Sequence, residues 1–389
     1  MTKTLKILMI IHAPWNRNLG ASRVQLELAE EFQLMGHQVE KFDFFDAFNP
    51  GKKSLIEQLT RPKFAEKAKA FVQANGHKFD IIDAHQGNLP FTKEELGFKG
   101  LLVARSVGLY AFYEEFAKQE KIKWPPKRMR TRLKNWWYSW QSQGENIRHL
   151  RSLQTCDLIN VPNYDELAYV RDDLHLGEKC FAFPFGLCQQ RQTAFFQAIQ
   201  PAAVRLANKQ VVFIGTWSPR KGAKEWGEII KRTKAQVPEA RFLFLGTGFS
   251  AETVLADLNL TDNNCVEIIP QFNSEELPQL LSGATVGAFP SYIEGFGFAV
   301  LEKLASGLPT VAYNVPGPRE MLPKLDDSLM IAVGDWQGFS DRLVQLLKLD
   351  LNTYTEMSQR CVEVAQRFLW NEIARDTLDV YLQFLAKQN

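Results

Sequence analysis

Two glutamates eight positions apart, Glu294 and Glu302, stand in the most informative stretch of the chain. Gly295 and Gly297 follow the first glutamate, and the apolar spacing of residues 298–306 predicts a helix that contains the second. At about 1.5 Å of rise per residue, the two carboxylates should lie roughly 8 to 12 Å apart, too far for one metal ion or a shared proton. The amides at the helix start can bind phosphate, and a carboxylate on each side can accept hydrogen bonds from hydroxyl groups. This order of groups suits a nucleoside diphosphate sugar.

Two permanent cations follow an earlier strand in the same half of the chain. Arg220 and Lys221 lie in the loop from Gly215 to Gly222, after a strand predicted at 210–215 and before a helix. Cations beside the amides of a glycine-bearing loop can neutralise a diphosphate. A solvated Lys–Arg pair on the surface is the alternative interpretation.

Length and composition indicate two domains without a large excess of charge. With 389 residues, of which 45% are hydrophobic, the chain can fill two cores. Lys and Arg number 46 against 44 Asp and Glu, and the net charge of +2 argues against a general polyanion-binding protein. Five scattered cysteines without Cys-x-x-Cys spacing argue against a disulfide framework and favour a reducing cytoplasm. Since no apolar run reaches the transmembrane length of about 20 residues, we expect any membrane contact to be peripheral.

Short apolar strands alternate with amphipathic helices, which is the pattern of parallel sheets covered on both faces. One helix is predicted from its cap residue Ser22 to Met35, and the polar, Gln-rich segment 187–208 is interpreted as a linker between two such units. The fold class is therefore α/β. The predicted strands are 5–13, 39–45, 79–84, 101–105 and 157–161 before the linker, and 210–215, 241–246, 266–270 and 285–289 after it.

The stretch around the two glutamates, P-S-x-x-E-G-F-G-x-x-x-L-E-x-x-A-x-G-x-P, resembles the retaining nucleotide-sugar glycosyltransferases of the GT-B fold, in particular glycosyltransferase family 4, the glycosyl transferases group 1. The resemblance implies two Rossmann-like domains with parallel sheets that face an interdomain cleft. Residues 1–190 would bind the acceptor and residues 205–371 the nucleotide-sugar donor. The sequence F-L-W-N-E-I-A resembles the start of the family's last helix, which implies that residues 372–389 cross back to the first domain.

The same resemblance implies roles for individual residues. Glu302 would accept hydrogen bonds from the ribose hydroxyls, Glu294 would face the donor sugar, and Lys221 would neutralise the departing diphosphate. Catalysis would depend on positioning and charge stabilisation, with no metal and no cofactor besides the UDP- or GDP-linked hexose donor, and the acceptor would be a saccharide or lipid-linked hydroxyl. The implied catalytic residues are Glu294, Lys221, Arg220 and His85, and the implied donor-binding residues are Gly20, Gly215, Thr216, Arg220, Lys221, Gly246, Gly248, Gln271, Phe272, Glu294, Gly295, Phe296, Gly297, Phe298 and Glu302.

Two positions depart from the family's pattern. Thr216 stands where the family usually has an arginine, and Val107 stands where relatives have a histidine. These departures motivate an alternative, a catalytically silent GT-B-shaped protein that binds a nucleotide or a membrane. In the first domain only Gly20 fits the family's glycine-rich loop, and nearby Arg23 is expected to be solvated.

The glycines at 246 and 248 also match part of a dinucleotide-binding fingerprint, because they follow a predicted strand. That fingerprint requires an acidic residue at the end of the next strand, whereas Glu267 lies inside it. An NAD-linked oxidoreductase is therefore a third alternative, and we favour a loop near a nucleotide.

A basic segment rich in tryptophan spans residues 121–151. A helix with aromatic residues on one side and cations on the other can lie on an anionic lipid surface, which would place the protein at the inner face of the membrane. The alternative that we favour is a domain helix that packs its tryptophan face on its own sheet. Nucleic acid is not an expected partner, because stacking platforms normally lie on exposed sheet faces. The tryptophans are Trp124, Trp136, Trp137 and Trp140.

Overall fold

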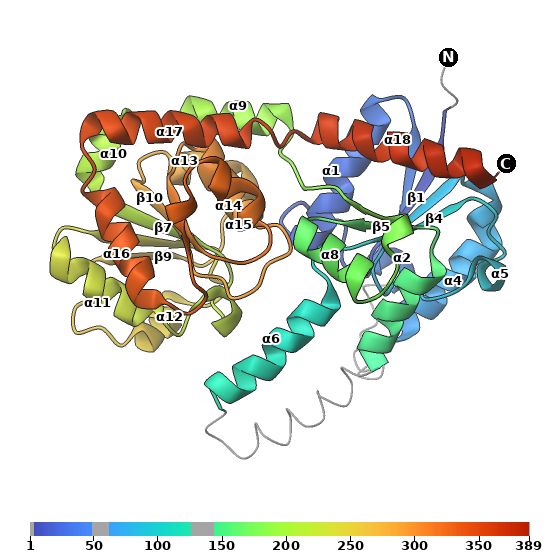
Figure 1. Cartoon of the computed structure of the whole chain (residues 1–389), viewed down its shortest axis with the longest axis horizontal. Coiled ribbons are helices and arrows are strands. Elements are labelled where there is room, and N and C mark those ends of the chain that lie inside the picture. The colour runs from blue at the N-terminus through green and yellow to red at the C-terminus, as the bar shows by residue number, and fades with distance from the viewer. Residues whose placement is uncertain (1–3, 49–61, 126–143, 389) are drawn as a thin grey trace. The chain divides into compact units, whose positions relative to one another are not determined.

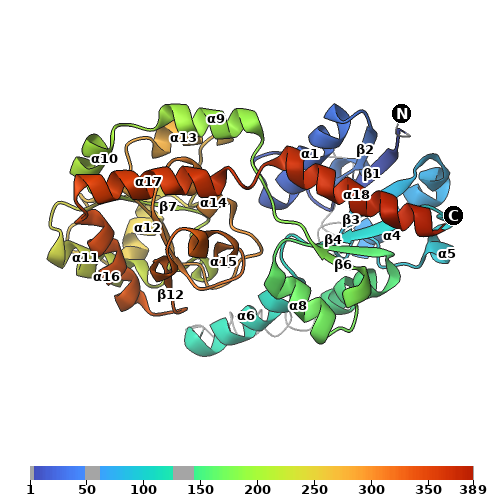
Figure 2. The same cartoon turned by 45° about the horizontal axis from the view of Figure 1, so that its top comes forward.

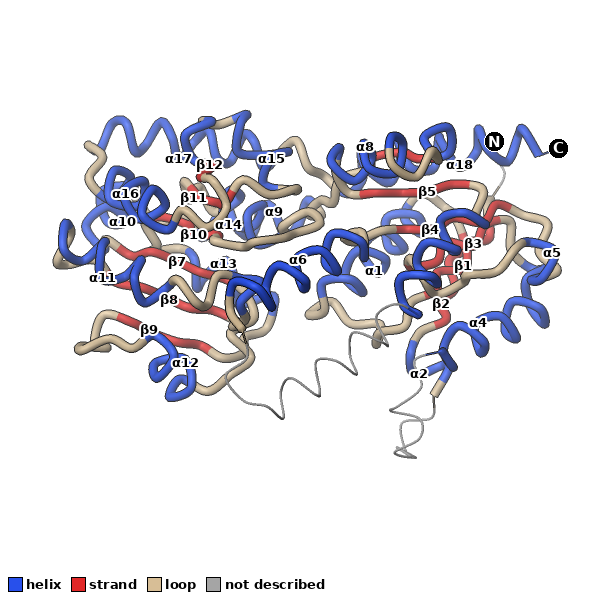
Figure 3. The backbone as a smooth tube through the Cα atoms, turned by 60° about the horizontal axis from the view of Figure 1, so that its bottom comes forward, coloured by secondary structure: helices blue, strands red, loops and turns tan. Residues whose placement is uncertain are grey.

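The computed structural model describes residues 4–48, 62–125 and 144–388. Contacts between the described residues divide the chain into two units. Unit 1 comprises Met1–Phe185 and Trp370–Asn389, and unit 2 comprises Gly186–Leu369. In each unit the strands form a layer with helices on both sides (Figures 1 and 3).

Unit 1 is built on a six-stranded parallel sheet. In sheet order the strands are β2 (Gln38–Phe42), β1 (Lys6–Ile10), β3 (Ile81–His85), β4 (Leu101–Arg105), β5 (Leu158–Val161) and β6 (Cys180–Ala182). In the register of the central strand, Ile7 pairs with Val39 of β2 and with Ile81 of β3. Strands β3 and β4 are buried along their whole length, which is typical of strands covered on both faces.

The helices of unit 1 cover both faces of this sheet. They are α1 (Gly20–Leu34), α2 (Phe44–Ala47), α4 (Pro62–Asn75), α5 (Lys93–Leu96), α6 (Tyr110–Lys123), a helical stretch at 144–155, α8 (Tyr164–Asp172) and α18 (Trp370–Gln388), with 3-10 turns η1 (Gly76–Lys78) and η2 (Gly177–Lys179).

Unit 2 repeats the same construction with a second six-stranded parallel sheet. In sheet order its strands are β12 (Met330–Ile331), β11 (Thr310–Tyr313), β10 (Val286–Phe289), β7 (Gln210–Ile214), β8 (Arg241–Leu245) and β9 (Val266–Ile269). The predicted α/β class is thereby confirmed. Its helical elements are α9 (Gln189–Ala198), α10 (Ala202–Asn208), η3 (Pro219–Lys221), α11 (Trp226–Gln236), α12 (Ala251–Leu258), η4 (Ser274–Glu276), α13 (Leu277–Leu281), α14 (Phe298–Ala305), α15 (Pro318–Met321), η5 (Leu322–Lys324), η6 (Asp327–Leu329), α16 (Trp336–Leu347) and α17 (Leu351–Ala365).

Helix α18 follows unit 2 in the chain but belongs to unit 1, where it packs on α1 and β4 (Figure 2). Tyr381 of α18 is fully buried, and its hydroxyl donates to Asp83 at 2.6 Å. The same hydroxyl accepts from Arg105 at 2.8 Å and from Asn160 at 2.9 Å. These hydrogen bonds fix α18 to strands β3, β4 and β5. The resemblance to the GT-B family likewise implies that residues 372–389 belong with the first domain.

Two local predictions are wrong. Residues 187–208 are not a linker but form α9 and α10 of unit 2, because the segment is rich in helix-forming glutamine and alanine and has buried anchors at Phe195 and Arg205. Helix α1 begins at Gly20 rather than after Ser22, and Leu19 holds the N-cap position without a side-chain cap. The Ser22 side chain is buried inside the first turn.

Candidate functional site

The two motif glutamates lie on either side of a glycine turn between β10 and α14. Gly297 occupies the N-cap position of α14 with φ of +86°, a conformation that favours glycine. Glu294 precedes this turn, and Glu302 lies within α14. The two side chains are only 15% and 6% exposed. Buried carboxylates require partners, and each glutamate has a cation of its own.

Glu294 forms an ion pair with Lys221, and Arg220 lies 4.0 Å from the same carboxylate oxygen. Burial raises the pKa of Glu294, but Lys221, Arg220 and the Gly295 N–H outweigh burial, so its pKa lies below the ordinary value. Burial lowers the pKa of Lys221 below its ordinary value, against the opposing effect of Glu294. The two cations predicted from the loop are thus brought to the first motif glutamate.

The loop that carries these cations docks closely on the end of β10. Gly222 has φ of +79°, and a Cβ atom at this position would lie 2.5 Å from the carbonyl oxygen of Pro290. The N–H of Tyr292 donates to the carbonyl of Arg220 at 2.8 Å. A side chain at Gly222 would separate the two segments, so this glycine sets the position of Lys221 relative to Glu294.

A second lysine, Lys303, is fully buried beneath this pair. Its ammonium donates to the carbonyl of Ala288 at 2.8 Å and lies 5.3 Å from the centre of the Phe289 ring. The Lys221 ammonium lies 5.0 Å from the same ring. Burial, with Lys221 nearby, lowers the pKa of Lys303 to about 7. Sequence reasoning missed Lys303, because a lysine within an amphipathic helix is normally read as exposed.

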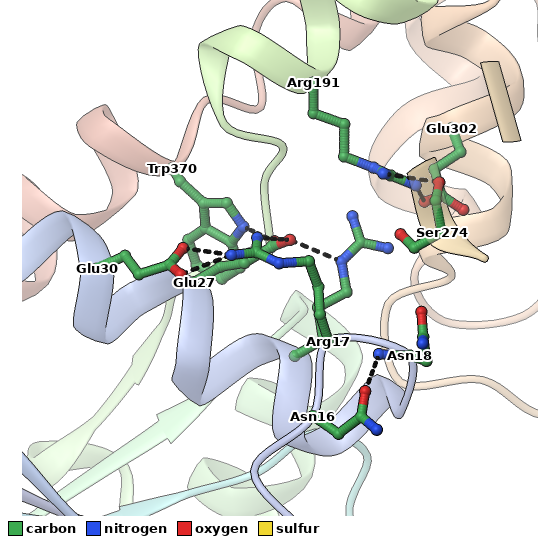
Figure 4. Close-up of polar contacts among 10 residues, drawn as sticks. Asn16, Arg17, Asn18, Glu27, Glu30, Arg191, Ser274, Glu302 and Trp370 are labelled. Atoms are coloured by element: carbon green, nitrogen blue, oxygen red, sulfur yellow. Dashed lines mark hydrogen bonds and ion pairs between the residues drawn. The ribbon is translucent and has the colours of Figure 1, made fainter. Parts of the chain in front are cut away.

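Glu302 is held by an arginine that sequence reasoning also missed. Arg191 of α9 donates from Nη2 to Oε1 of Glu302 at 2.8 Å and from Nη1 to the Ser274 carbonyl at 3.0 Å (Figure 4). Arg191 lies in the segment 187–208, which the sequence predicts as a linker, and a linker predicts no such contact. The available signal was Glu302 itself, because a carboxylate on the buried side of a helix requires a counter-charge.

The predicted glycine loops of unit 2 follow the carboxyl ends of β7 and β8. Gly215 donates its N–H to the Leu245 carbonyl at 2.9 Å, and a Cβ atom there would lie 3.7 Å from the Lys221 side chain. A Cβ atom on Gly248 would lie 3.6 Å from Thr216, and one on Gly246 would lie 3.0 Å from the Phe272 ring. These predicted residues therefore form one cluster of loops.

The other predicted donor residues of unit 2 divide into exposed and buried groups. Gln271 is exposed next to the half-buried Phe272. The Phe296 ring is buried, 6.1 Å from the Phe298 ring and 5.8 Å from the Phe368 ring. The Phe296 side chain is therefore part of the core of unit 2.

The sequence predicts a solvated Arg23, but this residue of helix α1 is buried. Arg23 donates to Oε1 of Glu27 at 2.9 Å, and Arg17 donates to the same oxygen at 3.1 Å. Trp370 of α18 donates its indole N–H to Oε2 of Glu27 at 2.5 Å. Arg17 also contacts Glu30 (Figure 4). We call Arg17, Arg23, Glu27, Glu30 and Trp370 the Glu27 cluster; Gly20, the first residue of α1, is exposed beside it.

The predicted site residue His85 lies at the end of β3, 91% buried, with its ring 5.3 Å from that of His12. Its Nε2 has no hydrogen-bond partner among the described residues. Burial, together with His12 and His149, lowers the pKa of His85 well below its ordinary value. Burial lowers the pKa of His149 to about 4 in the same way. At neutral pH both rings are uncharged hydrogen-bonding groups, and sequence reasoning had found only His85.

Val107, the position at which relatives have a histidine, follows Ser106 in the loop after β4. The Ser106 hydroxyl donates to Glu166 at 2.7 Å, and burial raises the pKa of Glu166 to about 7. The loop is thus anchored by a buried serine–glutamate contact. Its half-buried Val107 adds no polar group to the unit.

Most of the tryptophan-rich segment lies outside the described residues. Trp136, Trp137 and Trp140 lie outside the described residues, and Lys123 lies 4.9 Å from the centre of the Trp124 ring at the end of α6. Within residues 4–48, 62–125 and 144–388, no helix combines the length and the apolar character needed to cross a bilayer. Within the same ranges, no three His, Cys, Asp or Glu side chains are grouped to hold a metal ion.

Part of unit 2 is similar to a known family. Residues 197–368 match the family model described as Glycosyl transferases group 1. A D-inositol 3-phosphate glycosyltransferase of Mycobacteroides abscessus is 29% identical over 187 residues, 46% of this chain and 41% of that protein. An uncharacterized glycosyltransferase of Methanocaldococcus jannaschii is 26% identical over 247 residues, 59% of this chain and 56% of that protein. The chain thus spans about half of the length of these curated relatives, or less.

Comparison with solved structures identifies the fold. Sucrose-phosphate synthase from Thermosynechococcus elongatus superposes with a TM-score of 0.74 at 20% identity, covering 98% of this chain and 100% of that one. HepE from Anabaena, solved with UDP and glucose, gives a TM-score of 0.66 at 16% identity, covering 97% and 100%. The predicted GT-B fold and the predicted relationship to the group 1 glycosyl transferases are confirmed.

Proposed function

We propose, from a GT-B fold whose second unit matches the group 1 glycosyl transferases, that the protein transfers a hexose from a UDP- or GDP-sugar to a hydroxyl acceptor. One observation carries the proposal: Lys221 contacts Glu294 at the start of the helix that carries Glu302. Lys221 and the amides of the glycine turn would then contact the diphosphate of one donor, Glu294 its sugar and Glu302 its ribose. The HepE structure, which has a similar fold and contains UDP and glucose, supports this class of donor.

In the proposed mechanism the donor diphosphate displaces Glu294 from Lys221. The phosphate oxygens then accept hydrogen bonds from Lys221 and from the amides around Gly297, while Glu294 accepts a hydrogen bond from the sugar. As the bond between the anomeric carbon and the phosphate oxygen breaks, the acceptor oxygen forms its bond on the same face. The acceptor proton passes to the departing phosphate. Lys221 stabilises the charge that develops on this leaving group, which is the main catalytic contribution of the site.

Retention of anomeric configuration and independence of metal ions are further parts of the proposal. Lys221 and Arg220 supply two positive charges at the place where the diphosphate would bind, so the chain can neutralise the leaving group with its own side chains. We expect full activity in excess EDTA, and a product whose anomeric configuration, read by proton NMR, equals that of the donor. Loss of activity restored by Mg²⁺ or Mn²⁺, or an inverted product, would contradict this part.

The first experiment is a thermal-shift screen of the full chain with UDP, GDP, ADP and their hexose derivatives. A donor that binds only the folded state raises the free energy of unfolding by mass action, by about 2.7 kcal/mol at 100 times its dissociation constant, and the melting temperature rises with it. The best ligand is then incubated with the protein and assayed for released nucleoside diphosphate. No stabilisation by any nucleotide would contradict the proposed function.

A catalytically silent nucleotide-binding protein is the second candidate, favoured by Thr216 and Val107. This candidate also predicts stabilisation by a nucleotide, but no release of diphosphate from the donor even in long incubations. Release that requires Lys221 would exclude it. An NAD-linked enzyme would instead be stabilised by NAD and not by UDP or GDP.

We further propose a cytoplasmic protein whose acceptor is a saccharide or a lipid-linked hydroxyl, with no cofactor besides the donor. The basic composition of residues 121–151 supports contact with anionic lipid. Flotation with vesicles of phosphatidylcholine and phosphatidylserine tests this contact. Membrane contact predicts binding that appears only with the anionic lipid and disappears at high salt, whereas a domain helix packed on its own sheet predicts no binding to either vesicle.

A further inference from the structure

The contact between Arg191 and Glu302 joins three segments of unit 2 that are distant in sequence. Arg191 comes from α9, Glu302 from α14, and the carbonyl of Ser274 from the start of η4. The side chains of Arg191 and Glu302 are 9% and 6% exposed. The guanidinium thus bridges the Glu302 carboxylate and the Ser274 carbonyl (Figure 4).

Helix α9 does not depend on Arg191 for its attachment to unit 2. Gln192 donates to the carbonyls of Ala365 at 2.9 Å and Phe368 at 3.3 Å, and the Phe195 ring is fully buried. A buried ion pair is in general a weak source of stability, since desolvation of both charges offsets their attraction. Stability alone therefore gives little reason to bury an arginine here.

The Arg191 guanidinium also retains unused hydrogen-bonding capacity. Its Nε is buried and has no hydrogen-bond partner among the described residues. Buried polar groups nearly always have a partner, so an unsatisfied N–H beside a carboxylate indicates a polar ligand or an ordered water that completes the site. This observation is independent of the ion pair and indicates the same place.

We propose that Arg191 is a specificity-determining positioning residue, which holds the Glu302 carboxylate so that it selects a ribonucleoside diphosphate through the ribose hydroxyls. This inference rests on the proposed function and adds the residue that orients the ribose contact. A carboxylate held at one oxygen by a guanidinium that is itself fixed to a backbone carbonyl has few rotamers, so its hydrogen bonds to a ribose need little reorganisation. Without Arg191, Glu302 can rotate, and the ribose hydroxyls lose their preorganised acceptor.

The test compares UDP with 2′-deoxy-UDP by isothermal titration calorimetry on the full chain, with GDP and 2′-deoxy-GDP as the second pair. The wild type should bind the ribonucleotide about 10-fold more tightly, because a hydrogen bond to a charged group is lost in the deoxy ligand. Arg191→Met should weaken the ribonucleotide about 10-fold and the deoxy ligand less than about 3-fold. The ratio of the two affinities should therefore fall to near one.

Two further variants separate positioning from structural support. Arg191→Lys keeps the charge but not the planar fork, so its affinity ratio should lie between those of the wild type and Arg191→Met. It also serves as the test if Arg191→Met does not fold. Gln192→Ala, on the same helix, removes contacts that only hold α9 and should keep the wild-type ratio even where stability falls.

The outcomes distinguish this inference from the proposed function. If the wild type binds neither nucleotide pair, the proposed function and the inference both fail. If it binds UDP or GDP but Arg191→Met keeps the wild-type ratio, or weakens both ligands equally, only the inference is overturned.

Discussion

The Glu27 cluster of unit 1 and the ion pairs of unit 2 are both built from buried carboxylates and cations, but they differ in the number of donors that contact each carboxylate. In unit 2, Lys221 pairs with Glu294 and Arg191 with Glu302, so each motif carboxylate has its own close cation. In unit 1, two arginines and an indole converge on Glu27, and one of these arginines, Arg17, also pairs with Glu30. A ligand can displace one partner of a simple pair, whereas a carboxylate with three donors has most of its acceptor sites filled. We therefore expect the pairs of unit 2 to act in binding and the Glu27 cluster to act in stability.

The largest expected effect is the loss of the Lys221 charge. Lys221→Met should lower kcat/KM by about a thousandfold, roughly 4 kcal/mol, because the leaving diphosphate loses its main counter-charge. Lys224→Met is the matched control, since Lys224 is an exposed lysine of the same loop that lies 3.5 Å from Asp257. Initial rates of donor turnover measure both variants. Equal losses in the two lysine variants would show that the Lys221–Glu294 pair has no special role in donor turnover.

The next effect concerns Lys303, a buried cation of unit 2 that faces Lys221, Glu302 and the Ala288 carbonyl. Its pKa of about 7 in the folded chain lies below the ordinary 10.5. As pH falls from about 10 to 7, the unfolded chain therefore takes up a proton that the folded chain does not, and stability is lost. Below pH 7 the folded chain takes up the same proton, so little further stability is lost.

Lys303→Met removes this dependence. The stability of the wild type relative to Lys303→Met should fall by about 3 to 4 kcal/mol between pH 10 and pH 7. Urea unfolding at steps of one pH unit measures the difference, in which the other titrating groups largely cancel. A difference that does not change with pH would show that Lys303 stays charged in the folded protein.

A smaller effect is expected in the Glu27 cluster. Trp370→Phe removes the indole hydrogen bond to a buried carboxylate and should lower the free energy of unfolding by about 1 to 2 kcal/mol. Trp217→Phe in unit 2 is the matched variant, because its indole donates to Asp257, whose side chain is 41% exposed. It should cost less, since water can replace the lost donor. Nucleotide affinity should be unchanged in Trp370→Phe, as read by calorimetry.

The smallest effect is expected for Arg17, which is 35% exposed and shared between Glu27 and Glu30. Arg17→Ala should change donor affinity less than about twofold and stability by no more than about 1 kcal/mol. If donor affinity falls more than about fivefold, the Glu27 cluster binds the diphosphate, and the contrast between the two regions is wrong. Calorimetry with UDP or GDP and thermal unfolding provide the two measurements.

The features that sequence predicted are those fixed within a few residues. The strand, glycine turn and helix around Glu294 follow from local apolar spacing and from Gly297, and the cations of the η3 loop follow from neighbouring residues. Arg191 was missed because its partner lies 111 positions away, on a segment whose composition suggested a linker. Burial of Arg23 was missed because it depends on Glu27 and on Trp370, which lies 343 positions beyond Glu27.

The return of α18 to unit 1 sets an order for folding during synthesis. Residues 186–369 are translated between the two parts of unit 1, so unit 2 has its complete sequence first. Until Trp370 and Tyr381 leave the ribosome, Glu27 lacks its indole donor, and the Asp83–Arg105 ion pair lacks the phenol that hydrogen-bonds to both of its members. Part of the interior of nascent unit 1 therefore stays open to water until α18 is synthesised. A translational pause before residue 370 would prolong the interval in which nascent unit 1 can bind chaperones or aggregate.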